Sequence, residues 1–446
     1  MKFKMKVSKK QIGLFIASLF AMNALQAQES DTTVSGQLEK LKSEVAALNN
    51  LTITGYVQAQ AEFTQKLGNQ SYTVPNSMVG GGAFPAYFND RFNIRRGRLK
   101  FAYSASPLSQ AVFEIDATES GVAVKNAYVK FTEPFARFAS VTAGIFDRPY
   151  GYEIEYSASL RESPEESRMT QLLFPQDKDL GAKLTLQAPS SSYWNFIKLD
   201  VAAIAGNGVN ADFDRFKDEI AHLSFTKSFL DEKLKISGGI SDYWGGYANQ
   251  TKYVYNVNDV AGVKKFTVDS ASTNKNARAI KDLKGVDLQV SAQMPWGLMT
   301  VRGEYNTGKQ PSTATSNSYP TTAPAGDTYI RKVQGYYVYF VQNILQSRHQ
   351  IVLKYDSYDP NTGVKGSDIG VTGSKTSSAD IKYSTFGLGY IFKIDAHTKI
   401  MFYGDFVKNE KTNIKETKDA KGNITDPGFL TDRKDNVFTV RLQYKF

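Results

Sequence analysis

Three basic residues stand at alternate positions within segment 92–103, whose sequence is FNIRRGRLKFAY. In a β-strand, Arg96, Arg98 and Lys100 would therefore point to one face, while the apolar side chains of Leu99–Tyr103 point to the other. A row of guanidinium and ammonium groups attracts anions, and a guanidinium can replace part of the hydration shell of a phosphate with paired hydrogen bonds. The segment predicts an anion pathway along the inner face of a strand.

The first residues of this segment have the opposite parity, because Phe92 and Ile94 alternate out of step with the apolar residues that follow. Such a change predicts a β-bulge at Arg95–Gly97, where glycine tolerates the distorted backbone. Arg95 would then also point inward. Alternation adds Lys130 and Lys183 to the expected anion pathway.

A second interpretation of the arginine row stays open. Neighbouring strands carry carboxylates that would also face inward, and ion pairs with them would stabilise the wall without selecting solutes. The candidates for such pairing are Glu62, Glu114 and Asp116.

Catalytic chemistry has little support in the sequence. The three histidines, His222, His349 and His397, are far apart and show neither metal-ligand nor nucleophile spacing. No glycine-rich phosphate loop follows a strand, and the absence of cysteine excludes disulfides, thiolate metal sites and cysteine nucleophiles. We therefore expect no enzyme activity, no catalytic residue, no metal and no cofactor.

The elements that must position the basic residues are strands. From Leu51 onward apolar residues recur with a period of two, and the last segment shows this alternation from Phe438 to Phe446. Runs of about 9–13 residues fit tilted strands that cross a bilayer. Sixteen strands are predicted, at 51–63, 92–104, 108–116, 123–132, 137–146, 179–188, 193–205, 218–228, 233–243, 283–294, 297–306, 331–343, 347–357, 381–393, 397–409 and 435–446.

The connections between these strands alternate in length. Every second one is a tight turn, and most of the others are long and polar, which is the construction of outer-membrane barrels. The sequence therefore predicts an all-β fold, a sixteen-stranded antiparallel transmembrane β-barrel over 51–446, in the outer membrane of a Gram-negative bacterium.

Loop 147–178 is too long for an ordinary connection, and loops of this length are usually functional or disordered. A sixteen-stranded barrel otherwise leaves an open aqueous channel, so we expect this loop to fold inward and constrict it. Its glutamates make its charge mixed. The basic residues expected at the constriction are Arg148, Arg161, Arg168 and Lys178.

The composition of the 446 residues excludes a bundle of membrane-spanning helices, since no apolar stretch reaches the required length of about 20 residues. Residues 1–27 hold five lysines before an apolar run and end in Ala27, which predicts a secretory signal peptide. The formal charge of +10 would fall to about +5 on its removal, which weakens any nucleic-acid-binding role. We expect no nucleic-acid partner.

Residues 28–50 are predicted to form a short periplasmic helix. Leu38, Leu41, Val45 and Leu48 follow the spacing of a coiled-coil seam over about two heptads. An oligomerisation segment and a helix docked on its own domain are both compatible with this pattern.

Several segments resemble the phosphate-selective porin O and P family. Phe92–Leu99 is similar to an early Arg-Arg-x-Arg strand of that family. Gly144–Phe146 with Pro149–Gly151 resembles the entry into its third loop, and Lys178–Gly181 resembles the strand that leaves it. The terminal Phe446 and the nearby Tyr444 look like the C-terminal signature read by the barrel assembly machinery.

The resemblance implies a homotrimeric porin that passes small anions, phosphate among them, through a pore narrowed by inward-folded loops. The partners expected for such a protein are outer-membrane lipid, lipopolysaccharide and the assembly machinery. Two alternatives stay open: a non-selective or differently selective porin, and a non-conducting barrel whose loops bind partners.

Overall fold

The computed structural model describes residues 50–65, 84, 89–433 and 435–446. The chain divides into two compact units, Met1–Thr52 and Ile53–Phe446, and the second is described below. The predicted signal peptide and nearly all of the predicted helix lie outside the described residues. No helix among those described is long and apolar enough to cross a membrane.

Sixteen antiparallel strands form a closed ring, because each pairs with the next and β1 pairs with the last strand, β20. The prediction of a sixteen-stranded barrel is confirmed. The ring consists of β1 (Leu51–Thr64), β2 (Asp90–Ser106), β3 (Ser109–Thr118), β4 (Gly121–Thr132), β5 (Ala139–Asp147), β6 (Lys178–Gln187), β7 (Ile197–Ile204), β8 (Asp218–Phe229), β9 (Leu234–Ala248), β12 (Arg278–Met294), β13 (Gly297–Ser312), β14 (Thr328–Asn343), β15 (His349–Asp359), β16 (Tyr383–Lys393), β17 (Thr398–Asn409) and β20 (Val437–Lys445).

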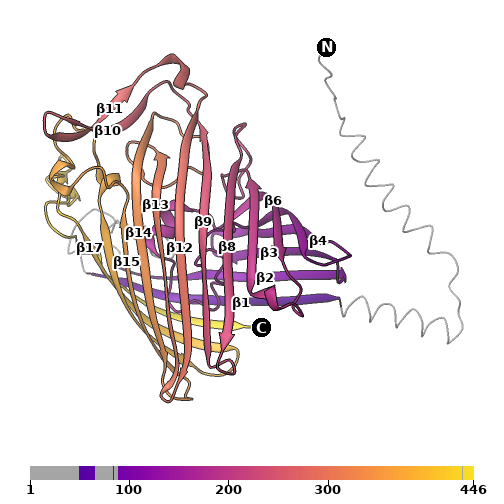
Figure 1. Ribbon diagram of the computed structural model, residues 1–446. Helices are drawn as coiled ribbons and strands as arrows, with labels where there is room; N and C mark the ends of the chain where they lie inside the picture. The colour runs from indigo at the N-terminus through magenta and orange to yellow at the C-terminus, as the bar shows by residue number, and fades with distance from the viewer. Residues whose placement is uncertain (1–49, 66–83, 85–88, 434) are drawn as a thin grey trace, which may run out of the picture. The chain divides into compact units, whose positions relative to one another are not determined.

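Short elements decorate the loops of this ring. The hairpin of β10 (Val254–Val260) and β11 (Val263–Asp269) was not predicted from the sequence, and it extends beyond the ends of the neighbouring barrel strands (Figure 1). It lies within a segment predicted to be one long loop, and its turn depends on Ala261 and Gly262 at positive φ. The remaining short elements are α3 (Arg168–Leu173), β18 (Thr417–Lys418), β19 (Ile424–Asp426) and the 3₁₀ turns η1 (Tyr193–Phe196), η2 (Ser272–Asn274), η3 (Gly366–Asp368) and η4 (Ser378–Asp380).

The barrel wall has an apolar outer face and a polar or packed inner face. On β13 and β14, Val301 and Val338 are 37% and 46% exposed, whereas the adjacent Arg302 and Tyr337 are 3% and 1% exposed. A bilayer core offers no hydrogen bonds, so a spanning sheet must close on itself and turn its apolar side chains outward. Charged side chains are thereby confined to the interior and to the two rims.

The ring closes at the C-terminal residue. The backbone of Phe446 exchanges two hydrogen bonds of 3.0 Å with the backbone of Gly55. A Cβ atom on Gly55 would lie 2.6 Å from the Phe446 ring and 2.6 Å from the carbonyl oxygen of Arg98. The absence of a side chain at position 55 therefore lets the terminal ring lie against the closing strand pair.

We expect Gly55→Val to impair closure, because overpacking at such a contact costs about 1–3 kcal/mol and here the backbone of β2 blocks escape. The fraction of folded barrel, measured by heat-dependent mobility in gel electrophoresis, should fall. Gly326→Val is the matched control, since a Cβ there meets nothing within 4 Å. Equal folding of both variants would contradict the assigned role of Gly55.

Candidate functional site

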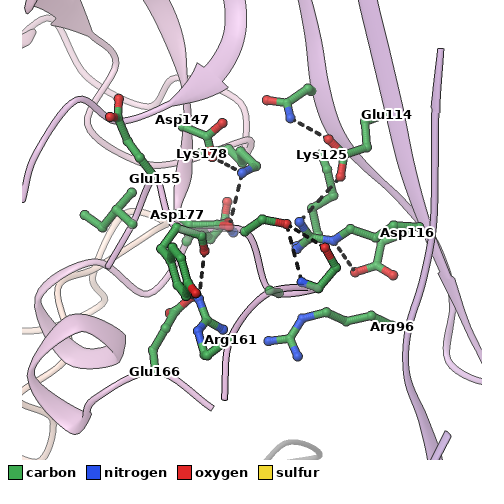
Figure 2. Close-up of a pocket in the computed structure, with 18 of the residues that line it drawn as sticks. Arg96, Glu114, Asp116, Lys125, Asp147, Glu155, Arg161, Glu166, Asp177 and Lys178 are labelled. Atoms are coloured by element: carbon green, nitrogen blue, oxygen red, sulfur yellow. Dashed lines mark hydrogen bonds and ion pairs between the residues drawn. The ribbon is translucent and has the colours of Figure 1, made fainter. Parts of the chain in front are cut away.

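A cavity of about 750 Å³ lies inside the barrel between the wall formed by β1–β4 and the loop that joins β5 to β6. Figure 2 shows Arg96, Glu114, Asp116 and Lys125 on one side of this cavity. The opposite side carries residues of segment 147–178. The labelled members of that second group are Asp147, Glu155, Arg161, Glu166, Asp177 and Lys178.

Two consecutive arginines of β2 bind the same loop carboxylate. Arg95 donates to Glu165 over 2.7 and 2.6 Å, and Arg96 donates to it over 3.2 Å. Both side chains thus depart from strict in-and-out alternation, at the place where the parity change predicts an irregularity. A Cβ on Gly97 would lie 2.3 Å from the carbonyl oxygen of Ala117, so this close approach requires glycine.

Glu165 also accepts a hydrogen bond of 2.9 Å from Arg441 on β20. Burial alone would raise the pKa of Glu165, but the charges of Arg95, Arg96 and Arg441 outweigh it and hold the pKa well below its usual range. One carboxylate therefore joins three guanidinium groups from two strands. Sequence reasoning treated this glutamate only as one of several that make the loop charge mixed.

The remaining basic residues of β2 differ in their pairing. Arg98 lies 3.4 Å from Glu114 and 3.5 Å from Asp116, as the wall-stabilising interpretation expects. Glu62 instead pairs with Arg91, at 2.7 Å. Lys100 lines the cavity without an ion-pair partner in the part of the chain that the structure describes.

Lys125 on β4 is a cavity residue that sequence reasoning missed. The β3–β4 register passes from Glu114 opposite Asn126 to Ile115 opposite Val124, which leaves Lys125 as the extra residue of a bulge. Within the described residues it also lacks an ion-pair partner. The signal was present in the sequence, because the apolar positions of β4 change parity between Val124 and Val129.

The basic residues predicted for the constriction loop separate into two groups. Arg161 and Lys178 line the cavity, where Arg161 binds Glu166 over 2.5 Å and Lys178 pairs with Asp147 and Asp177. Burial would lower the pKa of Arg161, but Glu166 and the carboxylates around it raise the pKa above its usual value.

The other two lie away from the cavity. Arg148 is buried and binds Asp179 over 2.7 and 3.0 Å, which ties the beginning of the loop to β6. The guanidinium of Arg168 lies 4.0 Å over the ring of Tyr383. Lys130 and Lys183, which alternation assigned to the anion pathway, are not among the residues that line the cavity.

Loop 148–177 is attached to strands on the far side of the barrel as well. Ser163 lies 2.7 Å from the hydroxyl of Tyr339 on β14, and Glu162 pairs with Arg302 on β13. Apolar side chains fill the space between the loop and β9–β17. They include Tyr150, Met169, Leu173 and Phe174 from the loop and Tyr243, Leu283 and Tyr337 from the strands.

The charges that line the cavity are nearly balanced but separated. Among the described lining residues, eight are basic and seven are acidic. On β2–β4 the basic residues exceed the acidic ones by five to two, and within 147–178 the acidic residues exceed the basic ones by five to two. The remaining charge is Lys445. A solute in this cavity therefore lies across a field that runs from the wall to the loop.

A metal site would need several histidine, cysteine or carboxylate side chains to lie close together. Within the described ranges, no set of three or more histidine, cysteine, aspartate or glutamate residues could hold a metal ion. His222 on β8 lies 3.7 Å from Asp287 on β12, and neither residue lines the cavity.

Comparisons with known proteins show the fold. Neither a protein family nor a curated protein matches the chain. OprB of Pseudomonas putida aligns with a TM-score of 0.55 and 8% identity over 91% of this chain and 96% of that one. OmpT of Vibrio cholerae, in a trimer form, aligns with a TM-score of 0.50 and 11% identity over 89% and 99% of the two chains. OmpF of Salmonella typhi, solved with daunomycin, aligns with a TM-score of 0.50 and 11% identity over 89% and 97%.

This similarity and the apolar outer wall agree on the location of the protein. A closed antiparallel barrel with an apolar outer face is the architecture by which strands cross the outer membrane. The protein is an outer-membrane β-barrel of a Gram-negative bacterium with a porin fold.

We expect Glu165→Gln to release the loop from the wall. Removing the carboxylate charge leaves three buried or half-buried guanidinium groups without their counter-charge. Loss of one partner from a buried ion pair lowers the stability of the native contact by about 3–5 kcal/mol. Single-channel recordings should show higher conductance and more open-channel noise. Glu155→Gln is the control, because within the described residues Glu155 makes a single ion pair, with Lys198 at 3.5 Å. Similar traces for both variants would contradict this role of Glu165.

The low pKa of Glu165 also predicts how the attachment of the loop to the wall depends on pH. The docking energy of a carboxylate with a depressed pKa is fully present above its ordinary pKa of about 4.3 and is lost as the pH falls through the depressed value. We therefore expect no loop release between pH 7 and pH 5, followed by noise growing only under strongly acidic conditions. Onset near pH 6 would show that another group controls docking.

Proposed function

We propose that the protein is a porin that lets small hydrophilic solutes diffuse passively across the outer membrane, with a modest preference for anions. The observation that carries this proposal is the polar cavity of about 750 Å³ between the barrel wall and loop 148–177. Its charged lining suits hydrated solutes, and the loop serves as the constriction. Activity as an enzyme is not part of the proposal.

The anion preference rests on two unpaired lysines. Lys100 and Lys125 line the cavity from β2 and β4 and have no carboxylate partner among the described residues. Arg95, Arg96 and Arg98 are engaged by Glu165, Glu114 and Asp116, so they are less available to a passing anion. The near balance of lining charges limits the preference.

Phosphate-type anions are included among the proposed solutes because of the resemblance of β2 and of the loop entry to the phosphate-selective porin O and P family. Lysine ammonium groups attract phosphate as point charges and leave its hydration partly in place. With the arginines paired to carboxylates, we propose attraction of phosphate without exclusive selection. Competition of phosphate against chloride in bilayer conductance measures this directly.

The proposal extends to the oligomeric state of the protein and to its insertion into the membrane. A homotrimer is proposed from the porin fold, and OmpT of Vibrio cholerae was solved in a trimer form. Tyr444 and Phe446 are half exposed on the outer face at the closing strand, where the barrel assembly machinery could engage them. Cross-linking in detergent tests the trimer.

We expect Lys100→Gln with Lys125→Gln to lower the anion-to-cation permeability ratio several-fold. Two unit charges 4 Å apart in water interact by about 1 kcal/mol, which corresponds to a factor of about five. The reversal potential across a salt gradient measures this ratio. Lys408→Gln, on an exposed lysine of β17, is the control.

Each outcome of this measurement assigns a different function. An unchanged ratio in the double variant would remove the lysines from the pathway. A ratio near one in the unmodified protein would favour a non-selective porin, which the eight basic and seven acidic lining residues also support. Absence of conductance would leave a surface barrel that binds partners through its loops.

A further inference from the structure

Two cavities lie one above the other on the outward side of β12–β14, away from the pore. The upper one has a volume of about 250 Å³ and is lined by Lys284, Lys309 and Lys332 together with Asp282. The lower one has a volume of about 440 Å³, and its outward lining is apolar, formed by Val286, Leu288, Val290, Val301 and Val338 around Gly303. Neither belongs to the proposed solute pathway.

The alternation of the three strands shows that both cavities face the membrane. Lys284 on β12, Lys309 on β13 and Lys332 on β14 are exposed, while Lys281 and Arg331 on the opposite face are buried. Tyr305 and Tyr336 pair across β13 and β14 between the two cavities, and they are 38% and 37% exposed. Such tyrosines belong to the aromatic girdle at a membrane–water interface.

The height of the lysines places them at the outer rim of the bilayer. Lys284 lies ten residues before Met294, Lys309 twelve after Gly297 and Lys332 eleven before Asn343, all counted from the ends at the short turns. About 9–11 tilted residues cross the hydrocarbon core. Three lysines thus stand where the head groups of the outer leaflet lie.

Two of these lysines lie opposite each other on neighbouring strands, an arrangement that a bound anion would stabilise. Lys309 and Lys332 are direct cross-strand partners. Like charges opposite each other destabilise a sheet. Neither lysine has an ion-pair partner in the described ranges, whereas Lys284 pairs with Asp242 at 2.9 Å. Asp282 lines the upper cavity, is the direct cross-strand partner of Lys309 and lies 3.9 Å from Lys284, so the three lysines share the carboxylates of Asp282 and Asp242. Among these described residues a net charge of about +1 remains.

The lower cavity exists because one side chain is missing. Leu288, Gly303 and Val338 form a cross-strand row on the outer face. Because Gly303 has no side chain, a groove lies between Leu288 and Val338 on the outer face. A groove of this kind fits a hydrocarbon chain lying along the strands.

From this pairing of a cationic pocket with an apolar groove, we propose a binding site for lipopolysaccharide on the outer wall of β12–β14. Lys309 and Lys332, with Lys284, hold a phosphate of the lipid A head group, and one acyl chain lies in the groove at Gly303. The acidic Asp282 and Asp242 limit the net charge, so the site selects a head group with concentrated negative charge.

The experiment uses the full-length protein refolded in detergent and counts retained lipids by native mass spectrometry. The probes are bisphosphorylated lipid A, the same lipid without phosphates, and phosphatidylglycerol. We expect the protein to retain lipid A over both other lipids. Lys309→Glu with Lys332→Glu should reduce retention at least about ten-fold, as expected for loss of charge-assisted contacts to phosphate.

A second variant and a matched control separate the two parts of the site. Val338→Trp fills the groove from its rim, so it should lower lipid A retention while leaving the lysines in place. Lys382→Glu with Lys408→Glu changes two exposed lysines at β16–β17 by the same charge and should leave retention unchanged. Bilayer conductance should match that of the unmodified protein in all three variants, which also reports correct folding.

Three results would overturn the proposal. Retention in the Lys309 and Lys332 variant equal to that of the unmodified protein would remove the phosphate contact. An equal loss in the control variant would reduce the effect to bulk charge. Retention of phosphatidylglycerol equal to that of lipid A would assign the groove to ordinary membrane lipid.

Discussion

The structure depends on the requirement that every backbone polar group inside a bilayer find a partner within the protein. The sheet meets it by closing β1 onto β20, and the last pair of this seam joins Gly55 to Phe446. Closure sends apolar side chains outward and confines charge to the lumen and the rims. The lumen must then accommodate many charges at short range, so their pairing determines how the interior is organised.

Glu165 shows how that pairing organises the interior of the barrel. Three arginines from β2 and β20 converge on this one carboxylate of loop 148–177, so the same contacts neutralise the wall and anchor the loop. On the far side of the barrel the loop packs among tyrosines and aliphatic residues. The cavity of about 750 Å³ lies beside β1–β4, where the loop meets charged side chains instead of apolar ones.

The sequence predicts the wall better than the site. Each strand carries its own period of two, so all sixteen could be recognised without knowledge of their neighbours. The site depends on contacts between distant segments, and no local pattern shows that Glu165 rather than Glu155 meets the arginines of β2. Lys125 is an intermediate case: the parity change in β4 marks its bulge, but only the β3 register shows which residue is displaced.

This difference explains why the number of basic residues alone does not determine the anion preference that we propose. Arg95, Arg96 and Arg98 form a cationic row in the sequence, yet each has a carboxylate partner. These ion pairs connect β2 to the loop and to β3. A solute responds to charge that the protein has left uncompensated. Under the two proposals, lysines that have no ion-pair partner within the described residues carry that charge, at Lys100 and Lys125 inside the barrel and at Lys309 and Lys332 on its outer rim. The same criterion, charge without a partner, therefore identifies candidate binding surfaces on both sides of one sheet.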